Sequence, residues 1–89
     1  MNAVRKIGNW LEADVDNETM MMNTESGMFV SLNRTARFLW KCLDEVQSTE
    51  ALLQKTIENF NVTPEQAEID IAACLKILQE EEAIIISVA

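Results

Sequence analysis

Hydrophobic and polar residues alternate near the start of the chain. Over residues 10–15, Leu11, Ala13 and Val15 fall on one face and the residues between them fall on the other. A period of two is typical of a half-buried strand, because successive side chains of a strand point to opposite faces. The pattern therefore predicts a strand over 10–15 with one face against a core.

Turn-forming residues divide the next stretch into short segments. Asp16-Asn17-Glu18 predicts a turn, and residues 24–27 predict a hairpin loop in which Gly27 is free to adopt a positive φ. Strands are expected on either side of this loop, at 19–23 and 28–32. Three consecutive strands with short turns form an antiparallel meander, so the third strand, 28–32, is expected at an edge of the sheet.

After residue 33 the spacing of apolar residues becomes helical. Ala36, Leu39, Trp40 and Leu43 recur at three- and four-residue intervals, which predicts a helix over about 34–46. Asn33 is suited to cap it, because its side chain can accept a hydrogen bond from an otherwise unpaired helix amide.

Two further helices and a last strand are expected. Ser48 or Thr49 caps a second helix, whose apolar face is formed by Leu53, Ile57 and Phe60.

The third helix has the clearest local signal in the chain. Thr63 is suited to cap it, Pro64 fits the first helical position, and Gln66 completes a capping box. Its expected buried positions are Ala67, Ile71, Cys74, Leu75 and Leu78. The helix is expected to end within 79–82, and the β-branched segment 83–88 predicts a short final strand.

These elements predict an α+β fold that resembles a winged helix: a three-stranded antiparallel meander, three helices and a short C-terminal strand. We expect residues 1–89 to form a single domain, with a flexible start over about residues 1–8.

Charge and composition restrict the partners. The chain has fifteen acidic and seven basic residues, for a net charge of −8. This surface repels phosphate backbones and anionic membranes, so neither nucleic acid nor membrane is an expected partner. Without a signal-peptide pattern or a long apolar run, a cytoplasmic location is expected, with Cys42 and Cys74 reduced.

The residues needed for most catalytic chemistry are scarce. The chain has no His and no Tyr, two glycines that form no phosphate-binding loop, and two separated cysteines. We therefore expect no enzymatic activity, no catalytic residues, no cofactor and no metal site.

Protein recognition remains as the expected function. An edge strand over 28–32 offers unpaired backbone groups to an extended peptide. Asp70, Ala73 and Ile77 flank the buried stripe of the third helix and are placed to wall a groove beside that strand. The same pattern is also typical of a hairpin strand whose edge binds nothing, and of an acid that is simply solvated.

Several short motifs, in order, resemble the PqqD-like family. They are residues 20–27, 29–33, Ala36 and Leu39-Trp40, followed by 62–67, Asp70-Ile71, Leu75 and Leu78. Together they cover about residues 10–86. Ala36 and Glu82 stand where glycine is frequent in the family, and Val30 and Ser31 replace the more usual aromatic and small residues.

The resemblance implies a protein that recognises the leader of a ribosomally made precursor peptide. In that family the leader is added as a strand beside the third strand and against the third helix. The precursor is then presented to a separate modifying enzyme or leader peptidase, as in pyrroloquinoline quinone or lasso-peptide pathways. The peptide-binding residues implied here are Met28, Phe29, Val30, Ser31, Leu32, Asp70, Ala73, Cys74 and Ile77.

Two questions stay open from the sequence. The competing interpretation is an acidic winged-helix adaptor that binds another protein without any precursor peptide. The expected oligomeric state is a monomer or a weak dimer.

Overall fold

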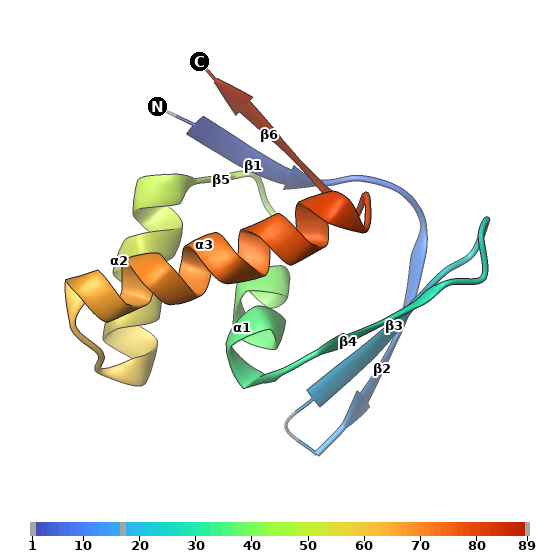
Figure 1. The fold of residues 1–89 in the computed structure, drawn as a ribbon, viewed down its shortest axis with the longest axis horizontal. Coiled ribbons are helices and arrows are strands. Elements are labelled where there is room, and N and C mark those ends of the chain that lie inside the picture. The colour runs from blue at the N-terminus through green and yellow to red at the C-terminus, as the bar shows by residue number, and fades with distance from the viewer. Residues whose placement is uncertain (1, 17, 89) are drawn as a thin grey trace.

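The computed structural model describes residues 2–16 and 18–88, which form six strands and three helices (Figure 1). In chain order they are β1 (Asn2–Lys6), β2 (Trp10–Val15), β3 (Glu18–Asn23), β4 (Phe29–Leu32), α1 (Arg34–Cys42), β5 (Gln47–Ser48), α2 (Thr49–Phe60), α3 (Pro64–Glu80) and β6 (Ile84–Val88). The predicted α+β architecture, with an antiparallel meander before three helices and a final strand, is confirmed.

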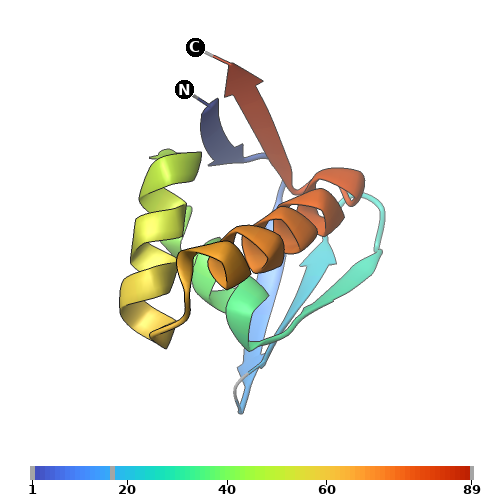
Figure 2. The same ribbon diagram turned by 60° about the vertical axis from the view of Figure 1, so that its left-hand side comes forward.

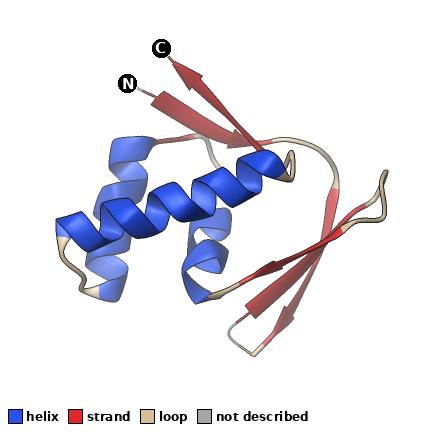
Figure 3. Cartoon of the chain, in the orientation of Figure 1, coloured by secondary structure: helices blue, strands red, loops and turns tan. Residues whose placement is uncertain are grey.

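The strands form two separate antiparallel sheets, which lie on different sides of the helices (Figure 3). One sheet has the order β2-β3-β4, so β4 lies at an edge as the sequence predicted. The other has the order β5-β1-β6 and brings the two ends of the described chain together (Figures 1 and 2). Helix α3 runs across the molecule between the two sheets.

Each helix begins at the cap that its sequence predicts. The amide of Ala36 donates to the side chain of Asn33 (2.9 Å) at the start of α1. At the start of α2 the amide of Ala51 donates to Ser48 (3.0 Å). At the start of α3 the amide of Gln66 donates to Thr63 (3.2 Å). These bonds satisfy amides that have no partner within the helix.

The expected flexible start is instead a strand. Residues Asn2–Lys6 form β1, the central strand of the second sheet, and Val4 has no exposed surface. Its partner β6 lies at the other end of the chain, with Val4 opposite Ile86. A local pattern carries no information about a partner 80 residues away, which is why this strand was not predicted.

The first helix is shorter than its expected range of 34–46. Helix α1 ends at Cys42, and the chain then turns to form β5, where Gln47 lies opposite Val4 and Ser48 opposite Ala3. The side chain of Gln47 donates to the carbonyl of Cys42 (3.1 Å). Residues 43–46, which helical periodicity had assigned to the helix, instead connect α1 to the strand that pairs with β1.

Strand β2 alternates as predicted, but its charged face is the one turned toward the helices. Trp10 packs edge-on against Trp40, with ring centroids 6.4 Å apart, and the carboxylate of Glu12 pairs with Lys41 (3.2 Å). Leu11 and Val15 are 59 and 64% exposed on the opposite face. The predicted turn after β2 falls partly on Asn17, which lies outside the described residues.

The core takes side chains from both sheets and all three helices. The largest fully buried apolar side chains are Trp40, Met21, Leu32, Leu39, Leu52, Leu78, Ile84 and Val4. In α2 the buried positions are Leu52 and Thr56, whereas the predicted Leu53, Ile57 and Phe60 are only partly buried. Thr56 is accommodated because its hydroxyl donates to the carbonyl of Leu52 (2.8 Å).

Candidate peptide-binding site

On the free edge of β4, every second residue directs its backbone N–H and C=O groups away from the sheet. Residues of an antiparallel pair alternate between bonding to their partner strand and pointing away from it. The N–H of Asn23 donates to the carbonyl of Met28 (2.9 Å), and this bond sets the phase of the ladder. The N–H and C=O groups of Phe29 and Ser31 therefore point away from β3. In the described residues no hydrogen bond outside the ladder uses them.

A small cavity lies between this edge and α3. Its volume is about 150 Å³, and its lining is mostly apolar. The lining residues are Glu18, Ser31, Leu32, Asn33, Ala36, Cys74, Ile77 and Leu78. Leu32 and Leu78 form a buried floor, whereas Ile77 is 53% exposed and forms part of the wall. The cavity is matched in size and polarity to one aliphatic side chain that enters from the edge of β4.

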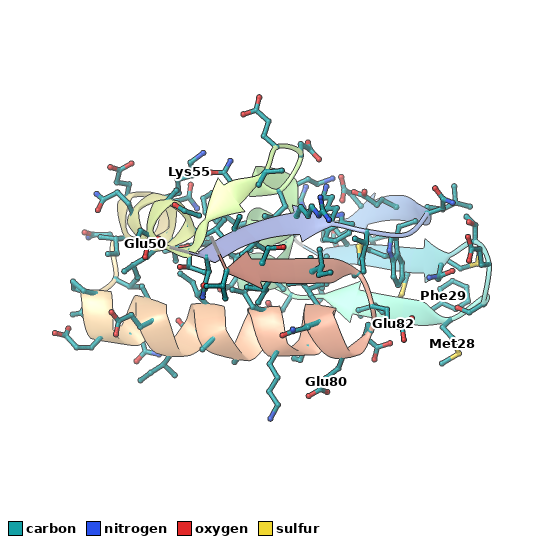
Figure 4. The ribbon with its side chains drawn as sticks, turned by 90° about the horizontal axis from the view of Figure 1, so that it is seen from above. Met28, Phe29, Glu50, Lys55, Glu80 and Glu82 are labelled. Atoms are coloured by element: carbon teal, nitrogen blue, oxygen red, sulfur yellow. The ribbon has the colours of Figure 1, made fainter. Side chains whose placement is uncertain are left out.

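The other end of β4 meets an acidic hollow. Met28 and Phe29 lie near the C-terminal end of α3, where Glu80 and Glu82 project (Figure 4). This hollow, about 310 Å³, is lined by Trp10, Asn23, Glu25, Ser26, Met28, Glu80, Glu81 and Glu82. Glu82 adopts a left-handed backbone conformation with φ 58°, which glycine adopts most readily. The two ends of the β4 edge thus differ in character, one apolar and one acidic.

The cysteine in the cavity wall, Cys74, is suited to packing and not to nucleophilic chemistry. Burial raises the pKa of the Cys74 thiol, and the nearby charge of Asp70 raises it further. Burial also raises the pKa of Cys42. Since the thiolate is the reactive form, both thiols are held in the unreactive state at neutral pH. Cys74 therefore contributes a small apolar surface to the cavity.

An ionic network holds the meander against α1. The hydroxyl of Thr19, which is fully buried, donates to the carboxylate of Asp14 (2.6 Å). This bond is the main reason that the pKa of Asp14 is lowered, and the charges of Lys41 and Arg37 lower it further. Lys41 bonds to Glu12 (3.2 Å), which raises the pKa of the lysine. The network orients β2 and β3, and through them the edge strand β4.

The structure brings together some of the predicted contact residues and separates others. Four of them line the cavity, namely Ser31, Leu32, Cys74 and Ile77. Phe29 is 64% exposed at the edge, and Met28 belongs to the acidic hollow.

Phe29 and three further predicted residues lie outside both hollows. Val30 is 7% exposed, with its side chain in the core and its backbone directed toward β3, so it supports the strand and is not an open contact. Asp70 accepts a hydrogen bond from Gln66 (2.9 Å), and neither Asp70 nor Ala73 lines the cavity.

Sequence reasoning missed several lining residues. Asn33 and Ala36 were assigned only to the start of α1, yet the cap that joins them places both beside Leu32. Leu78 was assigned only to the core, although it lies one turn beyond Cys74 on the same side of α3. Glu18 gave no signal, since it was assigned to the turn before the second strand.

None of the helices among the described residues is long and apolar enough to cross a membrane. Within the same residues, no group of three or more His, Cys, Asp or Glu side chains is placed to hold a metal ion.

Comparison with known proteins now adds to this geometry. The family described as "Coenzyme PQQ synthesis protein D (PqqD)" matches residues 18–84, which include both β4 and α3. The chain belongs to the PqqD family. The resemblance inferred from the short motifs is thereby confirmed. None of the curated proteins compared with the chain matches it in sequence.

A solved structure shares the fold of this PqqD-family chain. Its title is "TbiB1 in Complex with the TbiA(beta) Leader Peptide". The TM-score is 0.78 at 19% sequence identity, and the alignment covers 90% of this chain and 93% of the other. At this level of identity the likeness establishes a common fold and leaves the contact residues to be argued from this structure.

Proposed function

We propose that this PqqD-family protein binds the leader segment of a ribosomally made precursor peptide. The leader adds to the free edge of β4 as a further antiparallel strand and packs against α3. The observation that carries the proposal is the open backbone edge at Phe29 and Ser31, directly beside an apolar cavity. A strand edge supplies affinity through main-chain hydrogen bonds, and a pocket beside it supplies selectivity.

The phase of β4 predicts how the leader side chains are distributed. Leader residues that exchange backbone hydrogen bonds with Phe29 and Ser31 carry their side chains to the outside of the sheet. Leader residues between them point to the inside, toward α3, because side chains of a strand alternate. One of these inward side chains enters the cavity beside Leu32, and an aliphatic residue is the expected occupant.

Charge favours leaders that carry Lys or Arg. The chain has a net charge of −8, and three consecutive glutamates, Glu80–Glu82, line the hollow at one end of the edge. A basic leader residue near Met28 would lie beside these carboxylates. Its main effect is expected on the association rate, because exposed charges steer encounter more than they raise affinity.

The solved structure of similar fold was determined with a leader peptide, which supports the same ligand class for this chain. We further propose that the bound precursor is delivered to a separate modifying enzyme or leader peptidase, and that the protein itself is not catalytic. We also propose that Asp70 and Ala73, on the side of α3 facing this site, contribute secondary contacts to longer leaders.

A backbone-amide NMR titration tests the proposal. The probe is a synthetic leader of a precursor peptide encoded next to the gene for this chain. We expect shifts concentrated on residues 28–33 and on Cys74 and Ile77, with slowed exchange of the Phe29 and Ser31 amides. A titration with no shifts would reject leader binding and favour the adaptor interpretation.

Two substitutions at one position sharpen the test. Ser31→Pro removes an outward N–H and blocks strand addition, so leader affinity is expected to fall by roughly tenfold or more. Ser31→Ala keeps the backbone donor and serves as the matched control, with affinity close to that of the parent. Unequal circular dichroism spectra would show that Ser31→Pro had changed the fold. Equal losses of affinity in both variants would argue against backbone pairing.

A further inference from the structure

One face of α1 and α2 gathers most of the positive charge of this acidic chain. Two adjoining hollows, of about 250 and 460 Å³, lie on this face and share Phe38 and Asn59 in their linings. Of the seven basic residues of the chain, four line these hollows, and Glu58 is the only acid among the described lining residues. The four cations and two phenylalanines form what we name the basic face: Arg34, Arg37, Lys41, Lys55, Phe38 and Phe60.

The rest of the fold engages these four cations unequally. Arg37 and Lys41 pair with the two carboxylates of β2, at distances of 3.2 to 3.6 Å, so both belong to the network that orients this strand. Arg34 and Lys55 are exposed, and neither forms an ion pair with any residue that the structure describes. The charges of Arg34 and Lys55 are therefore available to a ligand.

Two phenylalanines give the basic face an apolar centre. Phe38 and Phe60 are half-buried and meet edge to face, with ring centroids 5.2 Å apart. The guanidinium carbon of Arg34 lies 5.4 Å from the centroid of the Phe60 ring, a contact that keeps this cation beside the aromatic pair. Because Phe38 lines both hollows, it lies between Lys55 and the cations of α1. The face therefore fits a ligand with an apolar group between negative charges.

We propose that the basic face docks an acidic segment of another protein, in which an aliphatic or aromatic side chain lies between carboxylates. The carboxylates pair with Arg34 and Lys55, and the apolar side chain packs on Phe38 and Phe60. Charge complementarity favours a protein over other anions. A nucleic acid would be repelled by the net charge of −8 around this small face. A small inorganic anion would leave the two rings uncovered.

The basic face lies apart from the leader site and has the opposite charge. Among the lining residues that the structure describes, none is shared between this face and the two hollows beside β4. Figure 4 shows Lys55 on the side of the molecule away from α3, and Glu80 and Glu82 at the end of α3. A basic leader and an acidic partner segment are thus attracted to different places. The partner is the enzyme that receives the precursor; this assignment rests on the proposed function, whereas the charge of the segment does not.

A backbone-amide NMR titration of the full chain tests the docking. The probe is an acetylated and amidated peptide with leucine and phenylalanine between flanking glutamates, and its control carries lysine in place of every glutamate. We expect saturable shifts centred on residues 34–41 and 55–60 with the acidic peptide only. The expected Kd is on the order of 1 mM at low salt, and it increases severalfold as the salt rises from about 0.05 to about 0.5 M.

Charge reversals at matched positions sharpen this titration. Arg34→Glu on α1 and, as a second variant, Lys55→Glu on α2 are each expected to raise the Kd of the acidic peptide roughly fivefold. Lys76→Glu makes the same change in net charge at an exposed position of α3, outside the basic face, and is expected to raise it less than about twofold. All three positions are exposed, so the variants should fold like the parent, which circular dichroism checks.

Three outcomes would overturn the proposal. The first is an absence of saturable shifts up to about 10 mM acidic peptide. The second is equal weakening by Arg34→Glu and Lys76→Glu, because the effect would then be one of net charge. The third is an equal response to inorganic phosphate, which would reduce the ligand to a simple anion. A leader peptide that fails to bind leaves this titration unchanged, so the leader site and the basic face can fail separately.

The enzyme encoded next to the gene for this chain tests the assignment of the partner. We expect it to bind the parent and Lys76→Glu with similar affinity, and Arg34→Glu roughly fivefold more weakly. Similar binding by both variants would reject this enzyme as the owner of the acidic segment. Saturating the chain with leader should leave the affinity for the acidic peptide unchanged, and a loss of that affinity would contradict two separate sites.

Discussion

The two sheets of this protein each have three strands, but they draw these strands from different parts of the chain. The β2-β3-β4 sheet is built from consecutive segments joined by short turns, and it leaves one edge and one apolar face open. The β5-β1-β6 sheet joins segments from the start, the middle and the end of the chain, and it buries Val4 and Ile84 against the helices. One sheet is placed for binding and the other closes the fold.

The difference follows from how each sheet is stabilised. Local turns and a buried inner face hold the meander, so its remaining edge can stay unpaired without loss of structure. The second sheet depends on pairing between the two chain ends, whose closure costs conformational entropy. Only buried contacts with the core compensate for that cost. Substitutions in the two sheets should therefore have different consequences, on stability in one and on binding in the other.

The largest expected effect lies in the closing sheet. Ile84→Ala removes a side chain that is 2% exposed and is expected to lower the free energy of unfolding by about 3 kcal/mol. The neighbouring Ile85→Ala is the matched control, since Ile85 is 40% exposed and its loss should cost less than about 1 kcal/mol. Urea denaturation measures both. Similar losses would mean that β6 does not pack on the core as described.

An intermediate effect is expected beside the binding sheet. Ile77→Ala shortens the wall of the cavity, at a position that is 53% exposed, and is expected to weaken leader binding roughly tenfold while stability changes little. Ile69→Ala alters the same residue type on the same helix, away from the cavity, and should bind like the parent. Isothermal titration calorimetry measures both affinities. A greater loss from Ile69→Ala would place the ligand elsewhere on α3.

The smallest effect concerns the network beneath the binding sheet. The pKa of Asp14 is lowered from its ordinary value of 3.8, so ionised Asp14 stabilises the folded state. This contribution is present above the ordinary pKa and is lost as the pH falls through 3.8 and the lower folded value. The destabilisation by Asp14→Asn should therefore be greatest near neutral pH and disappear in acid.

Thermal unfolding from neutral pH to below pH 3.8 measures the effect. Thr19→Val provides the control, because the Thr19 hydroxyl is the main cause of the lowered pKa. In that background Asp14→Asn should cost less, and a double-mutant cycle reports the coupling. An Asp14→Asn effect that does not change with pH would assign the loss to packing and not to charge.

Much of the fold was readable from local patterns. The caps Asn33 and Thr63 begin their helices as predicted, and Ser48, one of the two predicted candidates, begins the second helix. The meander has its expected order with β4 at the edge. These features depend on residues that lie close to each other in the sequence. The expected end of the first helix was wrong because β5 pairs with β1, a contact that local spacing cannot express.

The candidate site was only partly predictable. The edge strand and the facing side of α3 were found by pattern and by family resemblance, and Ser31, Leu32, Cys74 and Ile77 do meet at one cavity. Glu18 and Ala36 join them because the chain folds back at β3 and at the first turn of α1. The acidic hollow also required the tertiary structure, since it places the end of α3 beside the hairpin loop.

The sequence by itself determined the order of the meander, the three helices and the final strand, together with the helix starts, the free edge and the acidic charge. Each of these depends on neighbouring residues or on composition. Only the tertiary structure decided that β1 pairs with β6 and that the charged face of β2 turns inward. Simple hydrophobic alternation would have placed the apolar face of β2, and not its charged face, toward the helices. Lys41 and Arg37 on α1 neutralise the inward carboxylates, and the apolar side chains of Leu11 and Val15 on β2 are therefore exposed on the opposite face.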